Sequence, residues 1–122
     1  MLNETKRPGY VIEEGYDYAL AIESVGSGWS NLLWDVFKLI EHHNSTSSDK
    51  IIIVQVKEKW GGLRIYTNYS ILEIDKFLME TEKKSFRICE ECGAIGNLRK
   101  LNGTYKTRCE IHANGAIIIE GE

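Results

Sequence analysis

The sequence predicts an α+β fold with a mainly antiparallel sheet, two helices and a C-terminal zinc-ribbon-like hairpin. Three observations predict it: one segment with apolar residues at helical spacing, one β-branched segment followed by a glycine turn, and two pairs of metal-ligand residues that flank an Asn-Gly turn. A chain of 122 residues suits one domain over 1–122, in which residues 86–113 form a zinc-ribbon-like subdomain.

Near the N-terminus, two short apolar runs at 10–12 and 18–22 surround a Glu-Glu-Gly break. They predict a strand or arm, then a strand or short helix. After a Gly-Ser-Gly break, apolar residues recur every three or four positions from Trp29 to Ile40, which predicts a helix over 29–43.

Ser27 or Ser30 can cap this helix, and a polar loop follows over 44–49. The next strand, 51–57, turns at Trp60-Gly61-Gly62 into a second strand over 63–67. The predicted buried face carries Ile52, Val54, Val56, Leu63 and Ile65. The opposite face carries Ile53, Gln55, Lys57, Arg64 and Tyr66.

Ser70 and Glu73 match the capping-box pattern, which predicts that another helix begins there. Its apolar side is formed by Ile71, Ile74, Phe77, Leu78 and Thr81. Lys83 and Lys84 lie in its last turn, where they suit the helix dipole. An Asn-Gly turn near the C-terminus precedes a final strand over 116–119.

Composition excludes several classes of protein. Apolar residues make up 43% and charged residues 27%, as in folded globular domains. No run approaches the roughly 18 apolar residues of a membrane helix, and residues 1–8 lack the apolar core of a secretory signal. We therefore expect a cytoplasmic protein without a membrane partner. The 15 Lys plus Arg against 18 Asp plus Glu argue against a duplex-DNA binder.

The most specific motif is Cys89-x2-Cys92 followed after sixteen residues by Cys109-x2-His112. This spacing matches a tetrahedral Cys3His zinc site, and an odd number of cysteines cannot all pair as disulfides within one chain. The alternative is three free buried cysteines and an unrelated histidine. A site with four protein ligands has no open position for water, so we expect the Zn²⁺ to be structural.

A second unusual segment is the first hairpin, which gathers positive charges and aromatic rings around a glycine turn. Guanidinium and ammonium groups bind phosphate, and aromatic rings stack on bases, so the segment has the components of a nucleotide pocket. The candidate ligand-binding residues are Lys57, Lys59, Trp60, Arg64, Tyr66 and, from the side, Arg87. The alternative is a solvated hairpin whose Trp60 packs on a helix and whose Glu58 pairs with a lysine.

These motifs together resemble a family of small, uncharacterised phage, prophage and bacterial proteins. Gly28-Trp29, the segment QVKEKWGGLRIY, and the ending ICEECGAIG with RCEIHA resemble its GW element, its VKEKFGGLRFY-like hairpin and its CxxCG…CxxHA zinc ending. The resemblance covers residues 26–113, with Trp60 and Ile65 where the family pattern has phenylalanine. It implies a phage or mobile-element context and brings no catalytic residue.

Three functional hypotheses follow. The first is a non-enzymatic, homo-oligomeric phage-type protein that sequesters a small nucleotide-like signal in the host cytoplasm and so counters antiviral defence. The second is a zinc-ribbon adaptor that binds protein or single-stranded nucleic acid, and nucleic acid is the less favoured of these partners. Its contact face on the ribbon would be formed by Arg99, Lys100, Lys106 and Arg108. The third, an enzyme acting on phosphoesters, ranks last because no nucleophile or open metal site is evident.

Overall fold

The computed structural model describes residues 15–119, and the predicted α+β fold with antiparallel sheets is confirmed. Along the chain the elements are α2 (Tyr18–Val25), the 3-10 helix η2 (Ser27–Trp29), α3 (Ser30–Thr46), β1 (Ile53–Lys59), β2 (Gly62–Thr67), α4 (Leu72–Ser85), β3 (Asn97–Leu101), β4 (Thr104–Arg108) and β5 (Ile117–Ile118). β1 pairs with β2, and a separate sheet has the order β4-β3-β5. The apolar run at 10–12 lies outside the described residues.

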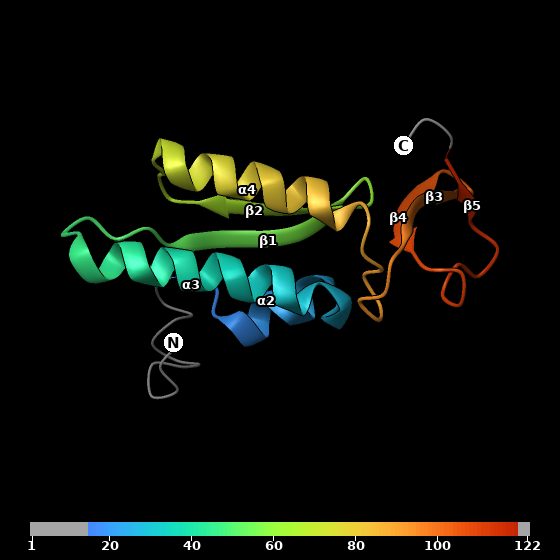
Figure 1. Cartoon of the computed structure of the whole chain (residues 1–122), viewed down its shortest axis with the longest axis horizontal. Coiled ribbons are helices and arrows are strands. Elements are labelled where there is room, and N and C mark those ends of the chain that lie inside the picture. The colour runs from blue at the N-terminus through green and yellow to red at the C-terminus, as the bar shows by residue number, and fades with distance from the viewer. Residues whose placement is uncertain (1–14, 120–122) are drawn as a thin grey trace.

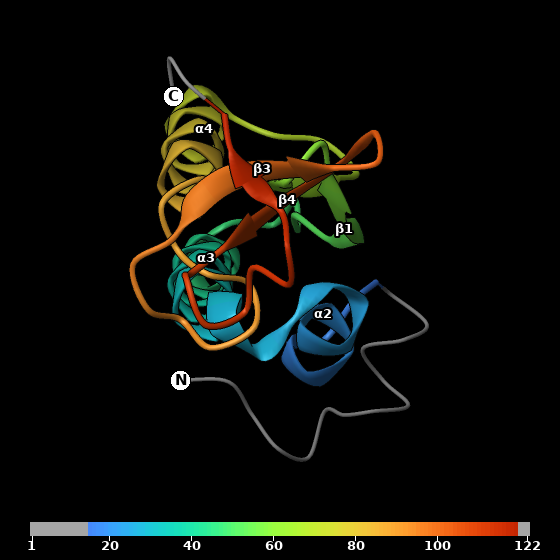
Figure 2. The ribbon, with the colours of Figure 1, turned by 90° about the vertical axis from the view of Figure 1, so that its right-hand side faces the viewer.

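The first hairpin, β1–β2, packs against helices on one side. Figure 1 shows β1 and β2 running alongside α3 and α4, with the β4-β3-β5 sheet at one end of this arrangement. The end-on view in Figure 2 shows α3 and α4 next to each other. α4 contacts both α3 and β2, while α2 contacts α3 and β1. The fold therefore consists of a helix-packed hairpin joined to a small C-terminal sheet.

One hydrophobic core holds the helices and the first hairpin together. Its buried residues are Ala21, Trp29, Leu32, Leu33, Val36, Phe37, Ile40, Ile51, Ile53, Val56, Leu63 and Ile74. The largest contribution comes from the apolar face of α3, as the periodicity predicts. Burying one such aliphatic side chain contributes roughly 1.5–3 kcal/mol, so this face accounts for much of the stability of the fold.

The N-terminal part of the core is helical, which decides between the two predictions for residues 18–22. Asp17 precedes α2 and caps it, because its carboxylate accepts a hydrogen bond from the backbone N–H of Leu20 at 2.8 Å. The Tyr18 ring meets the rings of Trp34 and Phe37 edge to face, so α2 packs on α3 through aromatic contacts.

α3 occupies the predicted position but has different ends. Neither Ser27 nor Ser30 caps it, because the chain enters α3 through η2 and Trp29 occupies the N-cap position without a side-chain hydrogen bond. The helix continues to Thr46, past the predicted end at residue 43. The hydroxyls of Ser45 and Thr46 donate to carbonyl groups three residues earlier, which satisfies the last turn.

The predicted β1–β2 hairpin forms, with a bulge in β1. Ile53 lies opposite Thr67, whereas Gln55 lies opposite Tyr66, so Val54 is an extra residue without a cross-strand partner. A bulge of this kind shifts the alternation of side chains by one position. As a result, the strand residues before the bulge do not follow the pattern of those after it.

The predicted faces are therefore correct after the bulge and wrong before it. Ile53 is only 4% exposed and belongs to the core, while Val54 is 48% exposed, the reverse of the prediction. Val56 and Leu63 are buried as predicted, and Ile65 is partly buried against the core. A strict alternation read from the sequence contains no information about an inserted residue.

α4 forms, but the predicted capping box does not. The helix begins at Leu72 and its N-cap is Ile71, so Ser70 lies one position too early, and its hydroxyl donates instead to the carbonyl of Ile71 at 3.3 Å. Lys83 and Lys84 occupy the last turn as predicted.

Candidate functional site

The four predicted metal ligands come from two loops at the end of the C-terminal sheet. Cys89 and Cys92 lie in a tight turn after α4, which is closed by hydrogen bonds from Cys89 N to Ala94 O at 2.8 Å and from Gly93 N to Cys89 O at 2.9 Å. Gly93 has φ +84°, a conformation that favours glycine. Cys109 directly follows β4, and His112 lies in the next turn. We call these turns the first and second knuckles.

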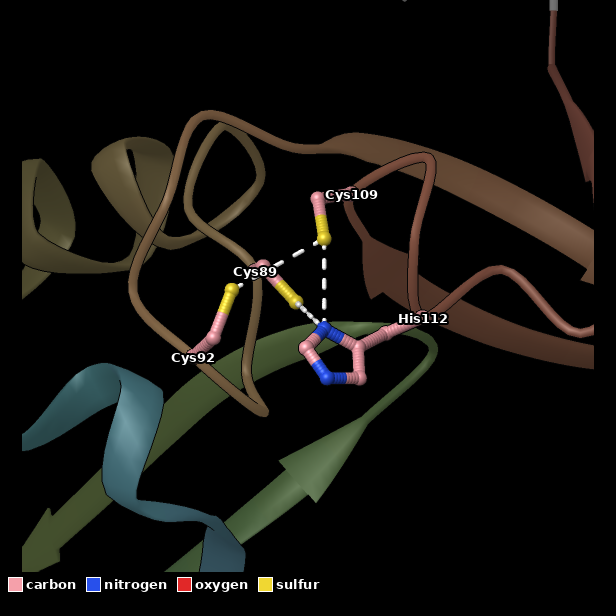
Figure 3. A group of neighbouring side chains, drawn as sticks. All are labelled: Cys89, Cys92, Cys109 and His112. Carbon is pink, nitrogen blue, oxygen red and sulfur yellow. Dashed lines mark hydrogen bonds between the residues drawn. The ribbon is translucent and has the colours of Figure 1, made fainter.

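The donor atoms of these ligands converge on one point. The Sγ atoms of Cys92 and Cys109 are 3.7 Å apart, and His112 Nδ1 lies 3.8 Å from Cys89 Sγ and 3.2 Å from Cys109 Sγ (Figure 3). With metal–sulfur bonds of about 2.3 Å and metal–nitrogen bonds of about 2.0 Å, tetrahedral geometry places sulfur pairs about 3.8 Å apart and sulfur–nitrogen pairs about 3.6 Å apart. The four residues therefore fit one tetrahedral metal ion.

The surroundings of Cys109 favour the ionised form of its thiol. Burial opposes ionisation of its thiol, but hydrogen bonds with the His112 backbone and with the other two cysteines outweigh burial, so the pKa of Cys109 is lowered. A thiolate is the form that binds metal. Within residues 15–119 this cluster is the one group of at least three such donors close enough to share an ion.

The first knuckle is docked on the segment Gly26–Trp29, which we call the glycine element. Gly28 N donates to Glu90 O at 2.9 Å, and the indole Nε1 of Trp29 donates to Ile88 O at 2.8 Å. A Cβ added at Gly26 or Gly28 would overlap a carbonyl oxygen of the knuckle. Glycine is therefore required here so that two backbone segments can approach each other.

The second hairpin, β3–β4, is docked on the turn of the first. The hydroxyl of Thr107 donates to Gly61 O at 2.6 Å, and both residues are buried. A Cβ at Gly61 would overlap Leu98, and one at Gly62 would overlap the ring of Phe86. Both turn glycines thus make close contacts inside the protein, which gives them a structural role.

A chain of ion pairs lies beside this contact. Glu58 accepts from Gly61 N at 2.6 Å and pairs with Lys106 at 3.2 Å, and Glu90 pairs with Arg108 at 2.8 Å. Burial raises the pKa of the Glu90 carboxyl, and Arg108 and Lys106 oppose that rise. Glu58 does pair with a lysine, as in the alternative for the first hairpin, but that lysine belongs to β4.

The predicted contact face of the second hairpin is largely occupied by internal contacts. Arg99 is 6% exposed and donates to the carbonyls of Arg108 and Ala116 at 2.9 and 3.2 Å. Lys106 and Arg108 are held by the ion pairs described above. Lys100 is exposed, and its ammonium lies 5.4 Å from the centre of the Tyr105 ring. Only Lys100 of the four faces solvent without an acidic partner among residues 15–119.

The candidate ligand residues of the first hairpin share its outer face. Lys57 lies directly opposite Arg64, and Gln55 directly opposite Tyr66, so the structure brings these side chains together as predicted. Arg64 Nε donates to Glu82 in α4 at 2.8 Å. The hydrogen bond with Tyr66 raises the pKa of Arg64, burial opposes the rise, and Glu82 adds to it. One edge of the guanidinium is therefore already bonded.

Trp60 lies at the tip of the first hairpin and is 61% exposed. Its ring does not pack on a helix as in the alternative; it meets the Tyr105 ring edge to face, with centroids 5.6 Å apart. Lys59, next to it, is exposed. Arg87 is exposed between α4 and the first knuckle, and its backbone carbonyl accepts from Gly96 N at 2.8 Å.

Several residues that organise this region are missing from the sequence-based prediction. The docking contact at Trp29 could have been inferred from the segment Gly26-Ser27-Gly28, since glycines at such spacing permit close backbone contact. Glu90, Thr107 and Tyr105 have no comparable signal, because their partners are distant in the chain.

Comparisons of the chain with protein-family models, with curated proteins and with solved structures found no significant match. None of the described helices combines the length and the apolar character that crossing a bilayer requires.

Proposed function

We propose that this chain is a non-enzymatic binding protein that takes a nucleotide-like ligand on the outer face of the β1–β2 hairpin. The observation behind the proposal is the gathering of cationic and aromatic side chains on this one exposed face. They are Lys57, Lys59, Arg64 and Tyr66, with Trp60 at the adjoining tip. Ammonium and guanidinium groups would bind phosphate, and the rings would stack on a base.

The charges on this face support an anionic ligand. Lys57 and Arg64 are directly opposite, and like charges in that position destabilise a strand pair. Glu82 compensates Arg64, whereas neither Lys57 nor Lys59 has an acidic partner within residues 15–119. A bound phosphate would relieve the repulsion between Lys57 and Arg64, and this relief would make the free energy of binding more favourable.

The metal would act through structure. Three thiolates and one imidazole at these distances favour Zn²⁺, and four protein ligands complete its coordination without water. The knuckles hold β3–β4 against the turn of the first hairpin, so zinc would stabilise the shape of the binding face. Because the cysteines and the histidine would all bind zinc, none would serve as a catalytic nucleophile or base.

The biological role rests on the resemblance to small phage and prophage proteins. A phage-encoded binder in the host cytoplasm could counter antiviral defence by sequestering a nucleotide signal. The face is an open surface on one protomer, so a homo-oligomer that brings two copies together would enclose the ligand more completely. Arg87, near the first knuckle, would add to the face from the side.

The proposal is tested by isolating the ligand from cells. Protein purified from a defence-active host should release nucleotides on denaturation, detectable by mass spectrometry, and the double variant Lys57→Gln, Lys59→Gln should release few or none. The matched control, Lys38→Gln with Lys84→Gln, removes two exposed lysines of α3 and α4 and should behave as the parent. Equal release from both double variants would contradict the proposal.

The second candidate, a zinc-ribbon adaptor, has less support because Arg99, Lys106 and Arg108 already bind partners within the protein. It would gain support if the purified protein released no nucleotide and retained a protein or a nucleic acid instead. If that partner were nucleic acid, its affinity should fall steeply with salt.

A further inference from the structure

Three two-residue turns of the described chain share one backbone conformation. In Asn102-Gly103 the φ angles are +52° and +81°, and in Asn114-Gly115 they are +51° and +91°. In Trp60-Gly61 they are +56° and +87°. Asparagine and glycine adopt this left-handed conformation readily, whereas a bulky residue adopts it only at a cost. Two of these turns are Asn-Gly, whereas the turn of the first hairpin has tryptophan in the position of the asparagine.

Burial does not compensate Trp60 for this conformation. The side chain is 61% exposed, and its one aromatic contact is the edge-to-face pair with Tyr105. The contact between the two hairpins is made mainly by other groups, namely the hydrogen bond from Thr107 to Gly61 and the ion pair of Glu58 with Lys106. A strained, exposed tryptophan that stabilises little within the protein indicates a contact with a ligand.

Tyr105 and Lys100 complete a small surface at this tip. They lie directly opposite each other on β3 and β4, and Lys100 Nζ is 5.4 Å from the Tyr105 ring centre. We call Trp60, Tyr105 and Lys100 the aromatic corner. It offers exposed ring surface for a base and a cation for a phosphate, and it contains residues from both hairpins.

The aromatic corner is well separated from Tyr66. Four residue steps along β2 separate Tyr66 from Gly62, which at roughly 3.4 Å per residue is about 14 Å, and Trp60 lies beyond that end. In a stacked strand successive nucleotides rise by about 3.4 Å, so this span corresponds to about four nucleotide steps. One nucleotide therefore cannot stack on both Tyr66 and Trp60.

We infer that the aromatic corner is a second base-stacking subsite, and that the ligand is a short oligonucleotide rather than a mononucleotide. This inference rests on the proposed function of the hairpin face. One base stacks on Tyr66 and another on Trp60, and the phosphates between them lie over Lys57 and Lys59. Stacking is tolerant of base identity, so the length of the ligand decides its affinity more than its sequence.

The experiment uses the zinc-loaded full chain, with 5′-AMP and pentaadenylate as probes in calorimetric titrations. Pentaadenylate should bind at least tenfold more tightly than AMP. Trp60→Asn introduces the Asn-Gly pair of the other two turns, so its melting temperature should equal or exceed that of the parent. It should nevertheless bind pentaadenylate at least tenfold more weakly than the parent does. The loss should be severalfold smaller for AMP, because AMP can also bind at Tyr66.

Tyr105→Thr keeps a good strand former and should also weaken pentaadenylate binding severalfold. Equal affinities for the two probes, each reduced by Lys57→Gln, would leave the proposed function standing and overturn the second subsite. Pentaadenylate binding unchanged in a folded Trp60→Asn protein would overturn it too. If neither probe binds the parent, both the subsite and the proposed function are refuted.

Discussion

Gly28 offers a direct test of how the glycine element holds the first knuckle. A Cβ in Gly28→Ala would overlap the carbonyl oxygen of Cys89 and lie 2.7 Å from that of Glu90. Both are backbone atoms, so the overlap can be relieved only if the knuckle or the start of α3 moves. Overpacking of this kind costs about 1–3 kcal/mol, and weakening of the Gly28 N–Glu90 O hydrogen bond costs about 1 kcal/mol more. We expect a loss of about 3 kcal/mol, or roughly 10 °C in melting temperature.

The assay is urea unfolding of the zinc-loaded protein, followed by circular dichroism, together with competition for zinc against a chromophoric chelator. Gly28→Ala should unfold at lower urea and give up zinc more readily, because the displaced knuckle carries Cys89. The control is Ser27→Ala, which removes only a 3.4 Å hydrogen bond from an exposed hydroxyl and should change stability by about 0.5 kcal/mol or less. If Gly28→Ala matches the parent in both measurements, the proposed docking is refuted.

Three further predictions concern the metal, the core and the binding face. The folded chain should contain one zinc ion by elemental analysis, and chelation or Cys92→Ser should unfold the C-terminal sheet; well-folded protein with little zinc would contradict this. Ile53→Asp should abolish soluble expression because Ile53 is buried, whereas Val54→Asp should melt within a few degrees of the parent. A soluble Ile53→Asp protein together with an insoluble Val54→Asp protein would disprove the bulge. Arg64→Ala should lower stability by at most about 1 kcal/mol, because the ion pair of Arg64 with Glu82 is partly exposed. It should weaken AMP binding tenfold, and Arg64→Lys should recover part of that binding. A stable Arg64→Ala variant that binds AMP as the parent does would remove Arg64 from the site.

Features with a short sequence signature could be predicted well. Each knuckle has its two candidate metal ligands three positions apart, so local turn geometry alone brings each pair together. The Asn102-Gly103 turn between them forms as predicted. It pairs β3 with β4 and so brings the knuckles to the same end of the sheet. The buried face of α3 could also be predicted, because the helical spacing of apolar residues shows which side chains lie on one side of the helix.

Features that depend on an inserted residue could not be predicted. Ile53 and Val54 differ little in chemistry, and both suit a buried or an exposed strand position. The bulge that buries Ile53 is visible only from the pairing of β1 with Thr67 and Tyr66 across the hairpin. A similar one-residue difference moved the start of α4 to Leu72 and left Ser70 outside the cap.

The partners of the charged residues on the second hairpin could not be predicted from the sequence either. The sequence shows that Arg99, Lys106 and Arg108 are basic, which made them candidates for an external contact. Their acidic and carbonyl partners, Glu58 and Glu90 among them, lie on other elements, so the folded structure alone shows that these charges stabilise the protein itself.

By itself, the sequence determined the α+β class, the helical face of α3, the first hairpin and the four residues that could hold a metal ion, because each depends on residues close together in the chain. The tertiary structure alone decided how the C-terminal sheet and its two knuckles meet the rest of the fold. The first knuckle docks on the glycine element, the Thr107 hydroxyl donates to Gly61 O, and the Trp60 ring meets the Tyr105 ring. These contacts join segments far apart in sequence, and their geometry depends on how all the elements pack at once. No local pattern of residue types encodes that arrangement.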